Sequence, residues 1–113
     1  MNAGDIYLAN FPFGGSVGTK LRPVLLLTGQ VGTVTEVVTA YISSAIPSPL
    51  LPSDLVLDPS TPDHRSTRLK VESVVRLHKL ATLHDRLLVR RLGKLSPAAQ
   101  QTVNSKLQSL LGL

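Results

Sequence analysis

The stretch that decides the fold is DIYLANFPFGGSVGTKLRPVLLLT, residues 5–28. Its first seven residues, Asp5–Phe11, alternate and include β-forming side chains, and residues 22–28 (RPVLLLT) form a short apolar run typical of a strand covered on both faces. Residues 12–20 hold three glycines, a serine and a threonine, which indicates an exposed loop. The pattern predicts two strands joined by this loop, with Pro23, which cannot donate to a ladder, at the start of the second.

Further strand patterns follow along the chain. The predicted strands are residues 33–42 (TVTEVVTAYI), 54–57, 68–76, 77–83 and 87–92, separated by proline-containing loops at residues 43–52 and 58–67. A 3.6-residue apolar period also fits residues 77–91, so a helix there is the alternative to the last two strands.

The chain ends in a predicted helix. Ser96 and Pro97 have the order of an N-cap residue and a first helical residue, and Gly112 is placed to stop the helix. Ala99, Val103, Leu107, Leu110 and Leu111 form one apolar stripe, which we expect to pack on the sheet. The predicted fold class is mainly β with a C-terminal helix (α+β): one domain, residues 1–113, with five to seven short strands in a small, strongly bent sheet or barrel.

Composition excludes several classes of protein. The 113 residues suffice for one core, and 42% are hydrophobic, which excludes wholesale disorder. The chain has no cysteine, so disulfides, thiolate metal sites and cysteine nucleophiles are excluded, and a reducing cytoplasm is the expected location. The apolar runs are too short to cross a bilayer, and we expect no membrane association and no secretory leader.

Positive charge is concentrated in one segment. The chain carries a net charge of +5, and residues 64–94 hold nine of its lysines and arginines against only Glu72 and Asp85. Such a segment is typical of a polyanion binder, and the alternative is a solvated basic face.

The residues that could carry chemistry are arginine, serine, threonine and histidine. No phosphate-binding loop, HExxH motif or nucleophile elbow is present, and the carboxylates are scattered. His78 and His84, with Asp85, could share a metal, but a third ligand is missing, so we expect no metal or cofactor. The remaining side chains suit metal-free handling of a phosphodiester.

Three segments carry a family resemblance. GDIYLANFPFGGSVGTKLRPVLLL (residues 4–27), AYIS (residues 40–43) and SVVRLHKLATLHDRLL (residues 73–88) resemble the MazF/PemK/Kid toxins. The resemblance implies a small SH3-like β-barrel of the MazF/CcdB type. It also implies a homodimer that cleaves single-stranded RNA at short sequences without a metal, together with a cognate acidic antitoxin.

The resemblance also implies catalytic residues. Arg22 stands at the Arg-Pro of the family and would grip the scissile phosphate, although it could simply edge a strand. Ser43 matches a Thr or Ser hydroxyl that helps to hold the phosphate. Arg76 matches a strand arginine that serves as an acid or a phosphate anchor. His78 stands where related toxins have an aspartate base, two residues from Arg76 and on the same face.

Four further residues are expected to contact RNA: Ser16, Thr19, Lys20 and Ser44. Ser44 could also take the place of Ser43, or both could only begin a loop. Val17 and Gly18 replace an acidic-glutamine pair that is common in the family. The arginines of residues 86–91 are additional candidates, with a solvated face as the alternative.

Three functions are compatible with these observations. The first is a metal-independent, sequence-specific endoribonuclease toxin of a type II toxin–antitoxin system, in which a ribose 2′-OH attacks phosphorus and leaves a 2′,3′-cyclic phosphate. The alternatives are an inactive relative that still binds nucleic acid or antitoxin, and a CcdB-like gyrase inhibitor. The gyrase inhibitor uses a C-terminal tryptophan, and this chain has no tryptophan.

Overall fold

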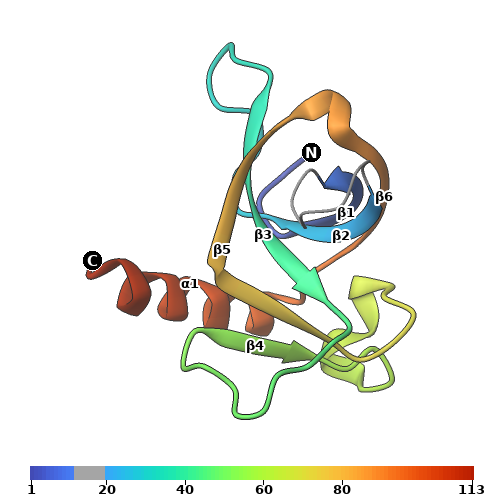
Figure 1. The fold of residues 1–113 in the computed structure, drawn as a ribbon, viewed down its shortest axis with the longest axis vertical. Coiled ribbons are helices and arrows are strands. Elements are labelled where there is room, and N and C mark those ends of the chain that lie inside the picture. Colours follow the sequence, from blue (N-terminus) through green and yellow to red (C-terminus); the bar gives the residue numbers. More distant parts are fainter. Residues whose placement is uncertain (12–19) are drawn as a thin grey trace.

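One antiparallel sheet and a C-terminal helix make up the fold (Figure 1). The structure, a computed structural model, describes residues 1–11 and 20–113. The elements are β1 (Asp5–Phe11), β2 (Lys20–Leu26), β3 (Glu36–Ser43), β4 (Asp54–Leu57), the 3₁₀ helix η1 (Pro62–Thr67), β5 (Ser73–His84), the 3₁₀ helix η2 (Asp85–Leu87), β6 (Leu88–Lys94) and α1 (Pro97–Leu111). The predicted mainly-β class with a C-terminal helix is confirmed.

The sheet is strongly bent but open. Its six strands are ordered β4-β5-β3-β2-β1-β6, so β4 and β6 are its two edges. In Figure 1 the strands β5, β3, β2, β1 and β6 curve round into a ring, while β4 and α1 lie below it. The sheet therefore has the expected barrel-like shape, but its edge strands β4 and β6 do not pair with each other, so the barrel is not closed.

The start of β2 differs from the prediction. The strand begins at Lys20, and Pro23 lies inside it, opposite Leu8 of β1. The pairing of β2 with β3 starts only at Val24, opposite Tyr41. At Pro23, β2 therefore pairs with β1 but not with β3. Because proline has no backbone N–H, it could not donate a hydrogen bond to β3, and none is required there.

The segment predicted as three strands forms two. The strand expected over residues 68–76 begins only at Ser73, and it continues through residues 77–83 as the 12-residue strand β5. Ala40 of β3 pairs with Leu80, whereas Tyr41 pairs with Arg76, so three β5 residues have no counterpart in β3. This bulge bends β5 sharply (Figure 1). The helical alternative for residues 77–91 is wrong.

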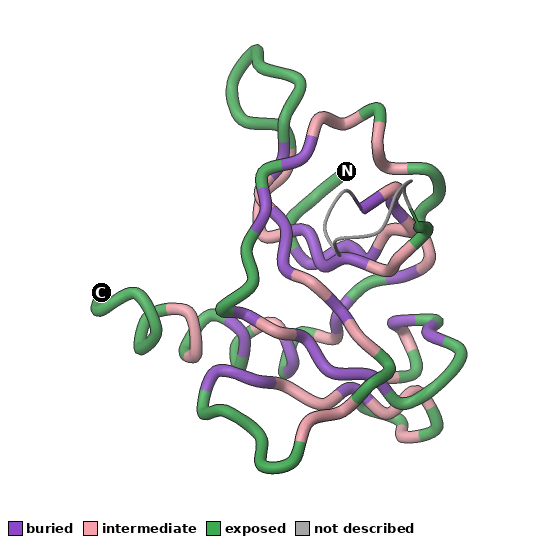
Figure 2. Tube along the Cα trace, viewed as in Figure 1, coloured by how far each residue is buried: buried purple, intermediate pink, exposed green. Residues whose placement is uncertain are grey.

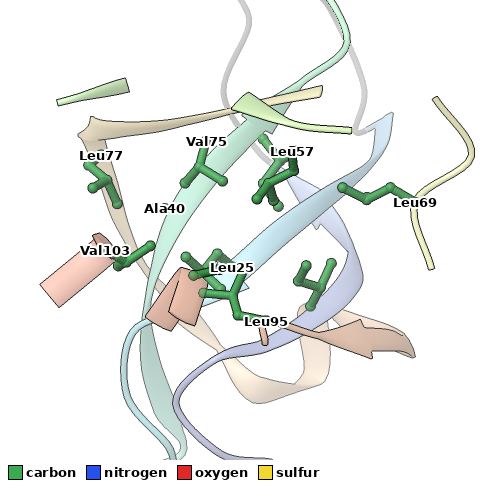
Figure 3. Close-up of a cluster of buried hydrophobic side chains, with 11 residues drawn as sticks. Leu25, Ala40, Leu57, Leu69, Val75, Leu77, Leu95 and Val103 are labelled. Atoms are coloured by element: carbon green, nitrogen blue, oxygen red, sulfur yellow. The ribbon is translucent and has the colours of Figure 1, made fainter. Parts of the chain in front are cut away.

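Two apolar clusters lie on opposite faces of the sheet, because successive strand residues point to opposite sides. The helix-side cluster contains Leu25, Val75 and Leu77 of the sheet and Val103 of α1 (Figure 3). The far-side cluster contains Val24 and Leu26 on β2, next to Leu25 in sequence.

The helix has the predicted ends but only part of the predicted packing. Ser96 Oγ accepts the N–H of Ala99 at 3.1 Å, and Gly112 ends the helix in the left-handed conformation at φ 71°. Ala99 and Val103 are buried, but Leu111 is 54% exposed. The expectation that the whole stripe packs on the sheet is wrong, because α1 extends beyond the sheet (Figure 2). No helix in the described ranges is long and apolar enough to span a membrane.

We predict that Leu25→Ala lowers the free energy of unfolding by about 2–5 kcal/mol, because Leu25 is fully buried in the helix-side cluster. Leu111→Ala is the matched control, with an expected change of about 0.5 kcal/mol or less. Urea denaturation of both variants measures the difference. Equal losses would contradict this assignment of the core.

Candidate functional site

Arg22 lies on β2, held by the pairing of that strand with β1. It is half-buried and stands opposite Ala9. Ala9 and Val24, two residues along β2, both belong to the far-side cluster. The strand register thus places Arg22 on the far-side face of the sheet.

Ser43 occupies the neighbouring position on β3. It is two residues beyond Tyr41, the partner of Val24, just as Arg22 is two residues before Val24. Because the β2–β3 pairing ends at Val24 and Tyr41, Arg22 and Ser43 lie just beyond the last paired residues, and alternation along each strand puts both on the far-side face. The Oγ of Ser43 accepts the N–H of Ala45 at 3.0 Å, which fixes the hydroxyl and leaves its hydrogen to be donated elsewhere.

Arg76 joins the same face from β5. It stands opposite Tyr41 on one side and opposite Asp54 of β4 on the other. Its Nε lies 2.8 Å from Asp54 Oδ1, and the two side chains are 17% and 0% exposed. Asp54 Oδ2 also accepts the N–H of Leu51 at 2.8 Å. A buried carboxylate needs such partners, so Asp54 holds Arg76 in place.

Asp54 is a functional candidate that the sequence reasoning missed. The sequence does contain a feature that points to Asp54, because it is the single polar residue of a strand that otherwise reads Leu-Val-Leu. An acid in such a strand requires a cation nearby. The pairing of β4 with β5, which brings Arg76 opposite, is a tertiary feature.

His78 is exposed and lies within the β5 bulge. The rule of alternation that put His78 on the same face as Arg76 does not apply there, because residues 77–79 have no partners in β3. The next residue, Lys79, places its Nζ 5.6 Å from the centre of the Tyr41 ring. His84 is bonded elsewhere, with Nε2 at 2.9 Å from the Thr35 hydroxyl.

The expected RNA contacts separate into three groups. Lys20 is exposed at the start of β2. Ser44 lines a groove that Ser43 does not line. Ser16 and Thr19 lie outside the described residues.

The groove has a volume of about 330 Å³ and carries a strong positive charge. Among the described residues, no carboxylate lines the groove, and four cations do: Arg22, Arg68, Lys70 and Arg90. Arg68, Lys70 and Arg90 come from the basic segment that the sequence singled out. Arg90 was one of the additional RNA-contact candidates, whereas Arg68 and Lys70 were not among the predicted site residues. Only the folding of residues 68–73 against β2 and β6 brings them together.

The wall of this groove is built on a close contact between η1 and β6. A side chain at Gly93 would lie 2.5 Å from the carbonyl oxygen of Thr67, so only glycine allows the approach. Ser66 Oγ donates to the carbonyl oxygen of Lys94 at 2.9 Å. Arg68 then ends η1 in the left-handed conformation, at φ 57°, and Leu69 is buried in the helix-side cluster. Arg68 and Lys70 therefore lie on a segment that these contacts hold in place.

The two parts of the site meet at Arg22. The β2–β3 pairing ends at Val24 and Tyr41, so Arg22 and the turn at Ser43 and Ser44 flank the point where the strands diverge. Arg22 and Ser44 both line the groove there. Ser43 and Arg76 are on the far-side face, whereas the groove is lined by Ile42 and Leu69 of the helix-side cluster, so Arg22 is the residue that the two parts share.

Comparison with known proteins agrees with this architecture. Residues 2–111 match the family described as PemK-like, MazF-like toxin of type II toxin-antitoxin system. The chain is 29% identical over 116 residues to the Endoribonuclease MazF of Staphylococcus saprophyticus, covering 100% of this chain and 92% of that protein.

Solved structures share the fold. A MazF toxin of Mycobacterium tuberculosis superposes with a TM-score of 0.75 at 23% identity, over 96% of this chain and 97% of its own. A mycobacterial endoribonuclease, solved in complex with its cognate antitoxin, gives 0.74 at 21% identity, over 100% of this chain and 96% of its own. With the family match spanning nearly every residue, this chain belongs to the PemK-like, MazF-like toxins of type II toxin–antitoxin systems.

Proposed function

We propose that this protein is an endoribonuclease toxin that cleaves single-stranded RNA without a metal. The observation that carries the proposal is the register that places Arg22, Ser43 and Arg76 on one face of the sheet. Two guanidinium groups and a hydroxyl can bind a phosphate through charge and donated hydrogen bonds. Membership of the toxin family and the name of the staphylococcal relative support the same activity.

The reaction needs three contributions. A base removes the proton of the ribose 2′-OH, and O2′ then bonds to the adjacent phosphorus while the bond from phosphorus to O5′ breaks. An acid protonates the departing O5′, and cations stabilise the charged phosphorane. The products are a 2′,3′-cyclic phosphate and a 5′-hydroxyl.

The residues divide these tasks. Arg22 binds the non-bridging oxygens, and the Ser43 hydroxyl donates to the same phosphate. Arg76, held at Nε by Asp54, has further N–H groups for a second anchor. His78 is exposed, and histidine is the side chain that most often serves as a general acid or base, so it is the candidate for that role.

The proposed partners are a second copy of the chain and an acidic antitoxin. The net charge of +5 is complementary to an acidic chain, and the mycobacterial structural neighbour was solved with its antitoxin. At the end of α1, Leu110, Leu111 and Leu113 are 40%, 54% and 88% exposed, which is apolar surface that a partner would cover. We place the activity in the cytoplasm, where the RNA substrate is found.

Arg22→Ala should lower the rate of RNA cleavage by about 100-fold or more, or roughly 3 kcal/mol of transition-state stabilisation, because it removes the main phosphate contact. Arg22→Lys should recover only part of the rate, since the charge remains without the planar pair of donors. Single-turnover cleavage of a mixed-sequence RNA measures both rates.

Arg65→Ala is the matched control, because Arg65 is an exposed arginine outside the groove and its loss changes the net charge equally. His78→Ala completes the comparison. A large loss of cleavage rate, together with the disappearance of one limb of the pH–rate profile, assigns His78 as the acid or base. A small loss of rate indicates that Arg22 and Ser43 act without it. Near-normal cleavage by a folded Arg22→Ala protein would refute the assignment of the site.

Cleavage should continue in EDTA and should leave 5′-hydroxyl ends, and DNA should not be cut because it lacks the attacking 2′-hydroxyl. End-mapping of the products on RNA and DNA of one sequence tests all three points. Activity that EDTA abolishes and magnesium restores, with RNA folding controlled, would exclude the mechanism.

The purified protein should have a mass near twice 12.1 kDa at micromolar concentration. A single small domain has limited surface to contact several nucleotides, and two copies supply two basic walls. Size-exclusion chromatography with light scattering measures the mass, and a value near that of one chain would rule out the dimer.

A further inference from the structure

We propose that the cationic groove is a subsite for one nucleotide adjacent to the scissile phosphate. The base lies on the apolar floor, and the flanking phosphates contact Arg68 and Arg90. The inference rests on the proposed function for the identity of the ligand as RNA. It assigns a role to residues outside the catalytic set.

Arg68 and Arg90 of the groove differ from Arg76 and Arg91 of the same basic segment, which are paired with acids. Arg76 is paired with Asp54, and Arg91 lies 3.3 Å from Asp5. Within the described residues, Arg68 and Arg90 have no carboxylate within ion-pair distance. Their charge is therefore available to an anion from outside the protein, and a phosphodiester is the anion that matches a guanidinium.

Lys70 is the weaker cation of the groove. It also lines a neighbouring hollow, together with the carboxylates of Asp58 and Glu72. Hydrogen bonds from the side chain and backbone of Ser60 hold the pKa of Asp58 below its usual value. The charge of Lys70 is therefore shared between the groove and a hollow that contains two acids. We therefore assign the phosphate contacts to the two arginines.

The floor of the groove suits the flat face of a base. Its apolar lining comes from β1, β2, β3, β6 and the segment before β5: Leu8, Leu21, Pro23, Ile42, Leu69, Val71 and Leu92. The volume of about 330 Å³ is at the small end of the ~300–1,000 Å³ range of ligand sites. It fits a single nucleotide, and a base can stack there on aliphatic and guanidinium surfaces.

Position and rigidity connect the groove to the proposed chemistry. Arg22 lines the groove and also belongs to the far-side face with Ser43 and Arg76. A nucleotide in the groove therefore neighbours the phosphate that Arg22 binds. Because η1 is fixed against Gly93 and Leu69 is buried, little ordering of the wall accompanies binding.

The first test measures phosphate contacts without requiring cleavage. A fully 2′-O-methylated mixed-sequence oligoribonucleotide, which cannot be cut, is titrated with protein by fluorescence anisotropy at several salt concentrations. The double variant Arg68→Ala/Arg90→Ala should bind at least about tenfold more weakly. Its slope of log K against log salt should be smaller by about 1.4, since each lost contact on a single strand removes about 0.7.

The matched control is Arg65→Ala/Lys94→Ala, which removes the same charge from exposed side chains outside the groove. Its salt slope should equal that of the native protein. An unchanged slope in Arg68→Ala/Arg90→Ala, or an equal drop in both double variants, would overturn the subsite.

The second test locates the base. A nucleoside 3′,5′-bisphosphate should shift the methyl NMR signals of Ile42, Leu69 and Leu92 through its ring current, and inorganic phosphate should not. The shifts should disappear in Arg68→Ala/Arg90→Ala. Bisphosphate binding without methyl shifts would overturn the nucleotide subsite, as would an acidic Glu/Leu peptide that shifts these methyls while the bisphosphate does not.

The two proposals fail separately. Native protein that binds the methylated oligonucleotide as expected but cuts no RNA would refute the proposed function and retain the subsite. Protein that cuts RNA while the double variant keeps its salt slope would refute the subsite alone.

Discussion

Three residues of β5 without partners in β3 shape the whole molecule. The register passes from Ala40–Leu80 directly to Tyr41–Arg76, and the strand bends over residues 77–79. One half of β5 pairs with β4 above the helix-side cluster, where Leu77 and α1 meet. The other half, with Ala81 and Leu83, closes around the far-side cluster. A single bent strand thus lets one small sheet cover two cores.

A second constraint places the functional groups. The β2–β3 ladder stops at Val24 and Tyr41, one residue after Pro23, which could not have extended it. Just beyond that point stand Arg22 and Ser43, each held by a paired strand on one side. Side chains at the end of a rigid hydrogen-bond ladder have a fixed direction and remain accessible to solvent, and a phosphate-binding site requires both.

The fold divides the basic segment into cations with different roles. Arg76 and Arg91 are paired with Asp54 and Asp5, which hold the two side chains in place and use part of their donor capacity inside the protein. Arg65 and Arg86 are exposed, which matches the solvated face that was the alternative interpretation. Arg68 and Arg90 line a groove in which the described part of the chain places no carboxylate. Charge counted along a chain cannot make this division, because it depends on which acids the strands bring alongside.

Local patterns were sufficient for much of this protein. Alternation and β-forming side chains identified β1 and β4 with their observed bounds, and the Ser-Pro start and Gly112 identified α1, because caps and periodicity act within a few residues. The family resemblance, and not a local pattern, drew attention to Arg22 at the Arg-Pro motif and to Ser43 at the end of β3. Tertiary structure alone decided the bulge, the Arg76–Asp54 pair and the groove of Arg68 and Arg90. Each of these joins segments that are distant in sequence, and their contacts depend on strand order and register, which no local pattern encodes.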